Sequence, residues 1–175
     1  RSRRGSGVFV CALPTEYPIG TRVRFHENLL AAGRTPDKRV LMIDLRAPSP
    51  GEAEILPGAT RVCAYHGLSL ADGQPIAVFE SIFPLNWLPG IDAALGETAS
   101  VTEALRTVGI ADYTRHSTRL TAVQADATQA AQLFIREGAP LLRSTSLNVD
   151  SEGRPIEFGR TFFVGDRVTL TLDGE

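Results

Sequence analysis

The sequence contains few of the residues that build metal, redox or membrane-spanning sites. Its 175 residues include only two cysteines, Cys11 and Cys63, whose spacing matches no zinc or redox motif. They predict free thiols in a reducing compartment, the cytoplasm. No apolar run approaches the roughly 18 residues of a membrane span, and the basic opening is followed by glycines rather than by the apolar core of a signal peptide. We therefore expect a cytoplasmic chain with no membrane partner and no metal or other cofactor.

A large excess of charge of one sign is also absent. Arginine and lysine number 18 against 20 acidic residues, a formal net charge of −2, and three of these cations are Arg1, Arg3 and Arg4. Because binding to nucleic acid requires a clustered cationic surface, the remainder of the chain is not expected to bind DNA itself. A hydrophobic share of 43% with 22% charged residues is typical of one globular domain.

The common catalytic motifs are missing as well. The sequence has no G-x-S-x-G, no phosphate-binding glycine loop and no H-E-x-x-H. Its three histidines, His26, His66 and His116, are not spaced as metal ligands. The sequence therefore predicts that the chain is not an enzyme.

Strand-like runs joined by tight turns alternate with short helical segments. The sequence Ala-Asp-Gly-Gln at 71–74 predicts a hairpin, and Pro14 with Pro18 predicts a linker over 11–20. This arrangement predicts an α+β fold, a mainly antiparallel sheet flanked by short helices. The expected strands cover 38–45, 60–70, 75–83, 113–123, 140–148, 155–164 and 167–172, and the expected helices begin near 21, 52, 100 and 127.

One expected strand carries a row of polar residues. Arg115, Ser117, Arg119 and Thr121 alternate along it and so share one face, with the two guanidinium groups roughly 13 Å apart. Arginine suits phosphate because its planar fork donates two hydrogen bonds at once. The alternative is an exposed strand with solvated cations.

Two expected helix starts could hold a small anion. Ser100 and Glu103 form a capping-box pattern, in which the serine hydroxyl and the following amides face outward from the helix end. Arg24, Phe25 and His26 open another helix. For both segments the alternative is a plain helix cap.

Two acidic residues lie in expected strands. Glu157 precedes a glycine on its strand face, so a small ligand has room to donate a hydrogen bond to its carboxylate. The alternative is a structural ion pair with Arg115, Arg119 or Arg160. Glu80 lies in an otherwise apolar strand and requires a partner, because an unpaired buried charge is costly.

These features occur in an order that resembles a known family of bacterial regulators. Residues 4–10 resemble the end of the β-wing in the winged helix-turn-helix domain of GntR-type regulators. The rest is similar to their UTRA effector-binding module, of the HutC subfamily, and most of all to regulators of phosphonate metabolism. The resemblance covers residues 3–172 and rests on Arg24-Phe25 with Gly33, 71–76, Ser100 with Leu105, 138–142, 153–157 and 165–167.

The resemblance implies a domain organisation, a fold and partners. Residues 1–10 would end the wing of a missing N-terminal DNA-binding domain, 11–20 would be a linker, and 21–175 would be a UTRA module with the chorismate lyase-like fold. Such modules bind a small anionic effector, form homodimers and contact operator DNA only through the other domain. For this chain the implied effector is phosphate- or phosphonate-like, and it would control DNA binding allosterically without being converted.

The resemblance also implies site residues. Members that bind sugar phosphates carry an Arg-x-Arg pair where this sequence has Gly67 and Ser69, so Arg115 or Arg119 is expected to supply the positive charge. Phe163 replaces a tyrosine that often closes the site. The full set of expected effector-binding residues is Arg24, Phe25, His26, Glu80, Ser100, Thr102, Arg115, Arg119, Glu157 and Phe163.

Two other functions remain open at this level. A lyase-like enzyme acting on a small carboxylic acid is suggested by the shared fold alone, and the wing-like start argues against it. A pure interaction module would lack a polar pocket.

Overall fold

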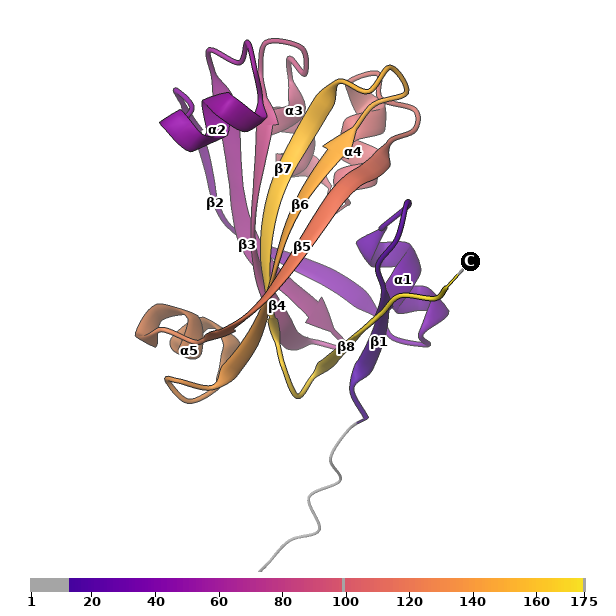
Figure 1. Cartoon of the computed structure of the whole chain (residues 1–175), viewed down its shortest axis with the longest axis vertical. Coiled ribbons are helices and arrows are strands. Elements are labelled where there is room, and N and C mark those ends of the chain that lie inside the picture. The colour runs from indigo at the N-terminus through magenta and orange to yellow at the C-terminus, as the bar shows by residue number, and fades with distance from the viewer. Residues whose placement is uncertain (1–12, 99, 175) are drawn as a thin grey trace, which may run out of the picture.

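Residues 13–98 and 100–174 are described by the structure, a computed structural model of the chain. No helix in these ranges is long and apolar enough to cross a membrane. Figure 1 shows the elements, which are in chain order β1 (Thr15–Pro18), α1 (Phe25–Ala31), β2 (Pro36–Arg46), α2 (Pro50–Ile55), β3 (Val62–Ala71), β4 (Gln74–Pro84), α3 (Ile91–Glu97), α4 (Val101–Thr107), β5 (Thr114–Gln124), α5 (Ala127–Leu133), β6 (Pro140–Val149), β7 (Pro155–Val164) and β8 (Val168–Thr171).

Six strands form one twisted antiparallel sheet in the order β2-β3-β4-β7-β6-β5 (Figure 1). The β3–β4 hairpin turns at Asp72 and Gly73, whose φ angles of 50° and 78° are the positive values that a tight two-residue turn requires. Gly153, with φ of 80°, lies in the turn between β6 and β7. The expected α+β fold with a mainly antiparallel sheet is confirmed.

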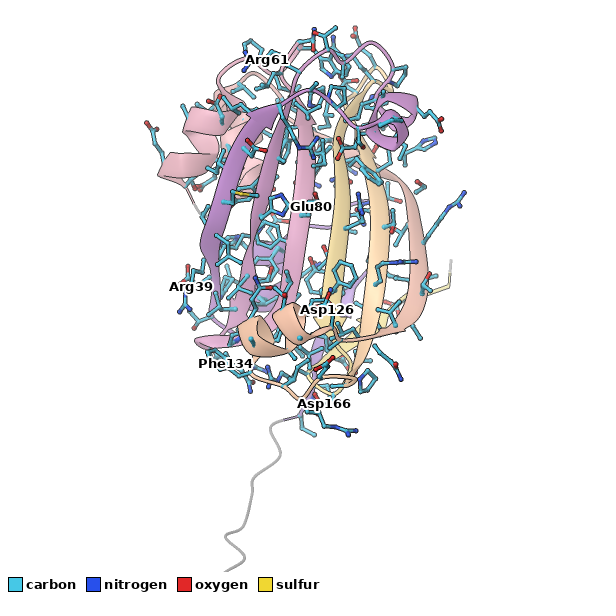
Figure 2. The ribbon with its side chains drawn as sticks, turned by 90° about the vertical axis from the view of Figure 1, so that its left-hand side faces the viewer. Arg39, Arg61, Glu80, Asp126, Phe134 and Asp166 are labelled. Atoms are coloured by element: carbon cyan, nitrogen blue, oxygen red, sulfur yellow. The ribbon has the colours of Figure 1, made fainter. Side chains whose placement is uncertain are left out.

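The helices cover the sheet unevenly and so define where a site can form. On one face, Leu95 of α3 and Leu105 of α4 pack with Tyr65 in a buried apolar cluster. Leu29 of α1 and Tyr17 of β1 form a second cluster on the same face. The opposite face is covered by α2 at one end and by α5 at the other (Figure 2). Polar side chains lie between the cluster of α3 and α4 and the cluster of α1 and β1.

Two elements differ from the sequence-based expectation. Pro18 predicts a linker, but Thr15–Pro18 pairs in parallel with Val168–Thr171. Proline is tolerated there because β1 has a strand on one side only. Helix α3 has no counterpart among the expected helices, and it begins directly after Gly90, whose φ of 85° is left-handed. The wing expected at residues 1–10 lies outside the described residues.

A β-bulge in β5 changes which side chains share a face. Arg115 pairs with Asn148, whereas Ser117, two residues later, pairs with Leu147. Because neighbouring residues of β6 point to opposite faces, Arg115 and Ser117 do so as well. The expectation that Arg115 and Arg119 lie on one face is therefore wrong, since Arg119 follows Ser117 onto the other side.

Candidate functional site

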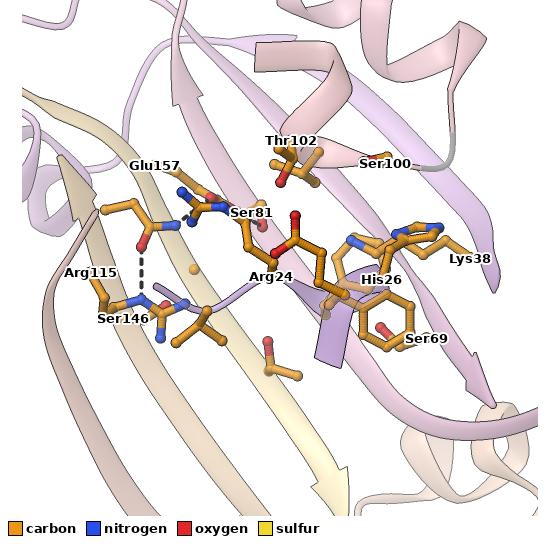
Figure 3. A pocket seen from close by; sticks show the side chains of 18 of the residues that line it. Arg24, His26, Lys38, Ser69, Ser81, Ser100, Thr102, Arg115, Ser146 and Glu157 are labelled. Atoms are coloured by element: carbon orange, nitrogen blue, oxygen red, sulfur yellow. Dashed lines mark hydrogen bonds between the residues drawn. The ribbon is translucent and has the colours of Figure 1, made fainter. Parts of the chain in front are cut away.

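A cavity of about 250 Å³ lies between the two apolar clusters, on the sheet face that α1 and α4 cover (Figure 3). Its volume is below the about 300–1,000 Å³ of pockets that hold drug-sized ligands, so it fits a small metabolite. Eight of the ten expected residues line it: Arg24, Phe25, His26, Ser100, Thr102, Arg115, Glu157 and Phe163.

Glu80 and Arg119 do not line this cavity. Glu80 lies on β4 directly between two residues that do, so strand alternation turns it to the opposite face. There it has charged partners, with Arg160 and His66 each 3.7 Å from its carboxylate oxygens. Arg119 lies on that same opposite face, beside Phe158. Both residues are corrections to the expected site. Strand alternation places Glu80 on the opposite face, and the β5 bulge places Arg119 there.

Glu157 forms the centre of a buried hydrogen-bond network. Ser81 Oγ donates to one carboxylate oxygen over 2.7 Å, and Asn148 Nδ2 donates to the other over 2.8 Å. Arg115 Nε donates in turn to Asn148 Oδ1 over 2.7 Å. The Asn148 amide therefore links the guanidinium to the carboxylate, and no described cation reaches Glu157 directly. The ion pair considered for Glu157 does not form.

Arg24 connects the start of α1 to the segment before β5. Its Nη2 donates to the carbonyl of Tyr113 over 2.6 Å and to Asp112 over 3.1 Å, and its guanidinium carbon lies 3.5 Å from the centre of the Tyr113 ring. The residue is only 8% exposed, yet its Nη1 is buried without a hydrogen-bond partner among the described residues. A buried donor of this kind is costly unless something pairs with it, and Arg24 lines the cavity.

Lys38 adds a further cation that was not among the expected residues. Its Nζ lies 4.7 Å from the centre of the Phe79 ring and 5.2 Å from that of Phe25. Burial lowers the pKa of the Lys38 ammonium group to about 8, with the Glu157 carboxylate acting in the opposite direction. Burial, and then Lys38, lower the pKa of His26. Lys38 therefore carries the charge near neutral pH.

Aromatic rings form one wall of the cavity. The Tyr17 ring centre lies 5.3 Å from that of Phe163 and 6.4 Å from that of Phe25. Burial raises the pKa of Tyr17, so its phenol stays neutral. On the α4 side, the hydroxyl groups of Thr102 and Tyr113 lie 2.8 Å apart and share a hydrogen bond.

Position 67 has no room for the first arginine of the Arg-x-Arg pair. A Cβ atom at Gly67 would lie 2.6 Å from the Phe79 ring and 2.6 Å from the carbonyl oxygen of Arg39, so no side chain fits. Ser69 lines the cavity and pairs with Lys38 across β3 and β2. The positive charge on this wall therefore comes from the neighbouring strand.

Ser100 acts as the cap of α4. Its Oγ accepts a hydrogen bond from the Glu103 amide over 3.2 Å. The Glu103 carboxylate accepts from the hydroxyl of Thr98 over 2.9 Å rather than from the Ser100 amide, so only half of the expected capping box forms.

Several lining residues were missed from the sequence: Tyr17, Lys38, Ser69, Phe79, Ser81, Arg106, Tyr113 and Asn148. A signal existed for Asn148, because it pairs with Glu157 across two strands, β6 and β7, that one tight turn joins. None existed for Ser81, whose place opposite Gly159 depends on the pairing of β4 with β7, two strands far apart in the sequence. No local signal marked Tyr17, since its segment was expected to be a linker.

Metal-binding groups do not gather in the part of the chain that the structure describes. No three histidine, cysteine, aspartate or glutamate side chains lie close enough there to hold an ion. Cys63 is buried, and burial raises the pKa of its thiol to about 12, so it is an inert core residue.

Comparison with known proteins identifies relatives across most of the chain. The UTRA domain profile matches residues 31–169. An uncharacterized HTH-type transcriptional regulator of Rhizobium meliloti is 32% identical over 160 residues, which are 90% of this chain and 65% of that protein. The probable transcriptional regulator PhnF of Escherichia coli is 30% identical over 177 residues, 98% of this chain and 72% of that protein. The chain thus spans about two thirds of the length of these relatives.

Solved structures agree on the fold. PhnF from Mycobacterium smegmatis superimposes with a TM-score of 0.81 at 22% identity, covering 93% of this chain and 72% of that one. The separate effector domain of the same protein gives a TM-score of 0.77 over 91% of this chain and 99% of that one, also at 22% identity. The profile match and the 30% identity to the Escherichia coli regulator together show that the chain belongs to the UTRA domain family of HutC-type GntR regulators, as the resemblance predicted.

Proposed function

We propose that the chain is the effector-binding and dimerising part of a GntR-type transcriptional regulator, and that its cavity holds a small phosphate- or phosphonate-like anion. One observation supports the anion most directly: Arg24 lines the cavity, and its Nη1 atom is buried with no described hydrogen-bond partner. A guanidinium donor so placed is satisfied by an anionic oxygen. Lys38 and Arg106 line the same cavity and add positive charge.

The proposed allosteric route runs through β1. Tyr17 contributes to the aromatic wall of the cavity. Its strand begins at Thr15, within the expected linker that follows the expected wing at residues 1–10. The β1 strand is held by pairing with β8 and by a hydrogen bond from Asn28 Nδ2 to the carbonyl of Pro18, 3.1 Å long. An effector that binds one position of Tyr17 better than another would shift β1, and with it a DNA-binding domain ahead of it.

The proposed homodimer is supported by the edge strand β2. This strand pairs with β3 on one side only among the described residues. Leu41 and Met42 are 44% and 49% exposed, and Val40 and Leu45 are exposed as well. An edge strand with exposed aliphatic side chains is a template for pairing with a second strand.

Calorimetric titration of the chain with propylphosphonate and inorganic phosphate tests the anion. We expect binding by the native chain and about ten-fold or greater weakening in Arg24→Lys, because a lysine cannot place a donor at Nη1 while keeping the Tyr113 contact. Arg119→Lys on the opposite face is the matched control and should bind as the native chain does. Thermal melting of each variant separates lost binding from lost folding.

Two results would contradict the proposal. If no small anion binds the native chain, the cavity is not an anion site and an interaction module becomes the better description. Equal weakening in the Arg24 and Arg119 variants would mean that overall charge, rather than this cavity, attracts the anion.

A further inference from the structure

We propose that the ligand of this cavity is bipolar: it carries a protonated amine that pairs with Glu157 as well as an anionic group that pairs with Arg24. The inference rests on the proposed function, since it names the chemical class of the ligand for the same cavity. It excludes simple inorganic anions and alkyl phosphonates as the best ligands. Small aminoalkyl phosphonates and amino-alcohol phosphates are the class that fits.

The first argument is the unpaired charge of Glu157. The residue is 9% exposed and lines the cavity. Its two oxygens accept one hydrogen bond each, from a hydroxyl and from an amide, and both donors are neutral. A carboxylate has about four acceptor positions, so about two remain. A buried carboxylate with only neutral partners is costly, and a ligand ammonium would offset that cost.

The second argument is that no cation of the described chain donates a hydrogen bond to Glu157. Arg115 donates through Nε to Asn148 and through Nη1 to Thr118 over 3.1 Å. Arg160 lies beside Glu80 on the other face of the sheet. Lys38 and Arg115 interact with Glu157 electrostatically, but neither donates a hydrogen bond to it. A ligand ammonium would therefore be its first charged hydrogen-bond donor.

The third argument is the distribution of polar groups along the cavity. Figure 3 shows Lys38, His26 and Ser69 toward one side, Glu157, Ser81 and Arg115 toward the other, and Arg24 between them. A ligand ammonium at Glu157 leaves the anionic group of the same molecule to pair with Arg24 and Lys38, so one small molecule with both groups can use both parts of the cavity.

Space beside Glu157 is kept open by the absence of a side chain at Gly159. A Cβ atom there would lie 3.1 Å from Ser146 Oγ and 3.8 Å from Ser81 Oγ, at the floor of the cavity. The space is small, which favours a primary ammonium over a bulky quaternary one.

Titration with two matched series of phosphonates tests the inference. Aminoalkyl phosphonates of increasing chain length are compared with alkyl phosphonates of the same number of non-hydrogen atoms. We expect the native chain to bind the best amine about ten-fold or more tightly than its alkyl counterpart, the effect of one charge-assisted hydrogen bond. Glu157→Gln should abolish this preference, so that the amine and its alkyl counterpart bind within about two-fold of each other.

Glu80→Gln is the control, because it removes the same charge from the opposite face and should keep the preference. The melting temperature of each variant shows whether it folds. The inference is overturned if alkyl compounds bind as well as amines at every length, or if the preference survives in Glu157→Gln. In both cases the anion site stands, whereas failure of every phosphonate and of inorganic phosphate to bind would overturn the proposed function itself.

Discussion

The titration of Lys38 yields a prediction that can be worked out from the structure. Its ammonium group has a pKa of about 8 because it is buried against Phe25 and Phe79. A bound anion favours the charged form and raises this pKa toward the ordinary value of about 10.4. Binding above about pH 8 must therefore take up a proton. At about pH 9 roughly ten of every eleven cavities hold neutral Lys38, so affinity should fall about ten-fold from its value near pH 7, or about 1.4 kcal/mol.

Calorimetric titration of propylphosphonate across this pH range is the assay. Repeating it near pH 9 in buffers of different ionisation enthalpy should reveal an uptake approaching one proton per ligand. Lys38→Arg keeps its charge throughout and is the matched control, since ionisation of the phosphonate itself affects both proteins equally. The lowered pKa of His26 and the raised pKa of Tyr17 keep both groups neutral in this window. Parallel loss of affinity in the native chain and in Lys38→Arg would refute the reasoning.

Three further predictions concern stability, the cavity floor and assembly. The Arg46 guanidinium holds the pKa of Glu52 at about 2, well below its usual value. We therefore expect the stability that this carboxylate contributes to be complete above about pH 4.5 and to fall by about 3 kcal/mol as the pH drops toward 2. Urea unfolding of the native chain and of Glu52→Gln should converge at low pH. Gly159→Ala should weaken phosphonate binding about ten-fold with little change in melting temperature, because the added methyl group crowds the cavity. Unchanged affinity would contradict the placement of Gly159 at the floor of the cavity. Leu41→Lys combined with Met42→Lys should raise the dimer dissociation constant at least about ten-fold in sedimentation, and a strictly monomeric native chain would contradict the dimer.

Local chemistry predicted most of the sheet. The strand over Pro155–Val164 has the bounds that its residues predict, and the hairpin at Asp72-Gly73 adopts the positive φ angles that such a turn needs. These features depend on the conformational preferences of neighbouring residues, which a sequence displays directly. Strand β1 escaped prediction because Pro18 is compatible with a strand only at an edge, and no local pattern shows which strands become edges.

The candidate site was predictable only in part, and the two errors have structural causes. Arg119 was grouped with Arg115 by simple alternation, and one extra residue in β5 reverses the parity between them. Lys38 was overlooked because nothing near it in the sequence marks a cavity; it faces one only because β2 pairs with β3 at Ser69. A bulge and a strand pairing are properties of two segments together.

The amino-acid sequence by itself determined the type of fold, the family and the kinds of charged group available. Tertiary structure alone decided which of these groups meet. Arg24 and Tyr113 are 89 residues apart, and Ser81 and Glu157 are 76 apart, yet each pair is in hydrogen-bond contact. Such contacts follow from strand order and register, which are set by the packing of the whole sheet and cannot be read from either segment alone.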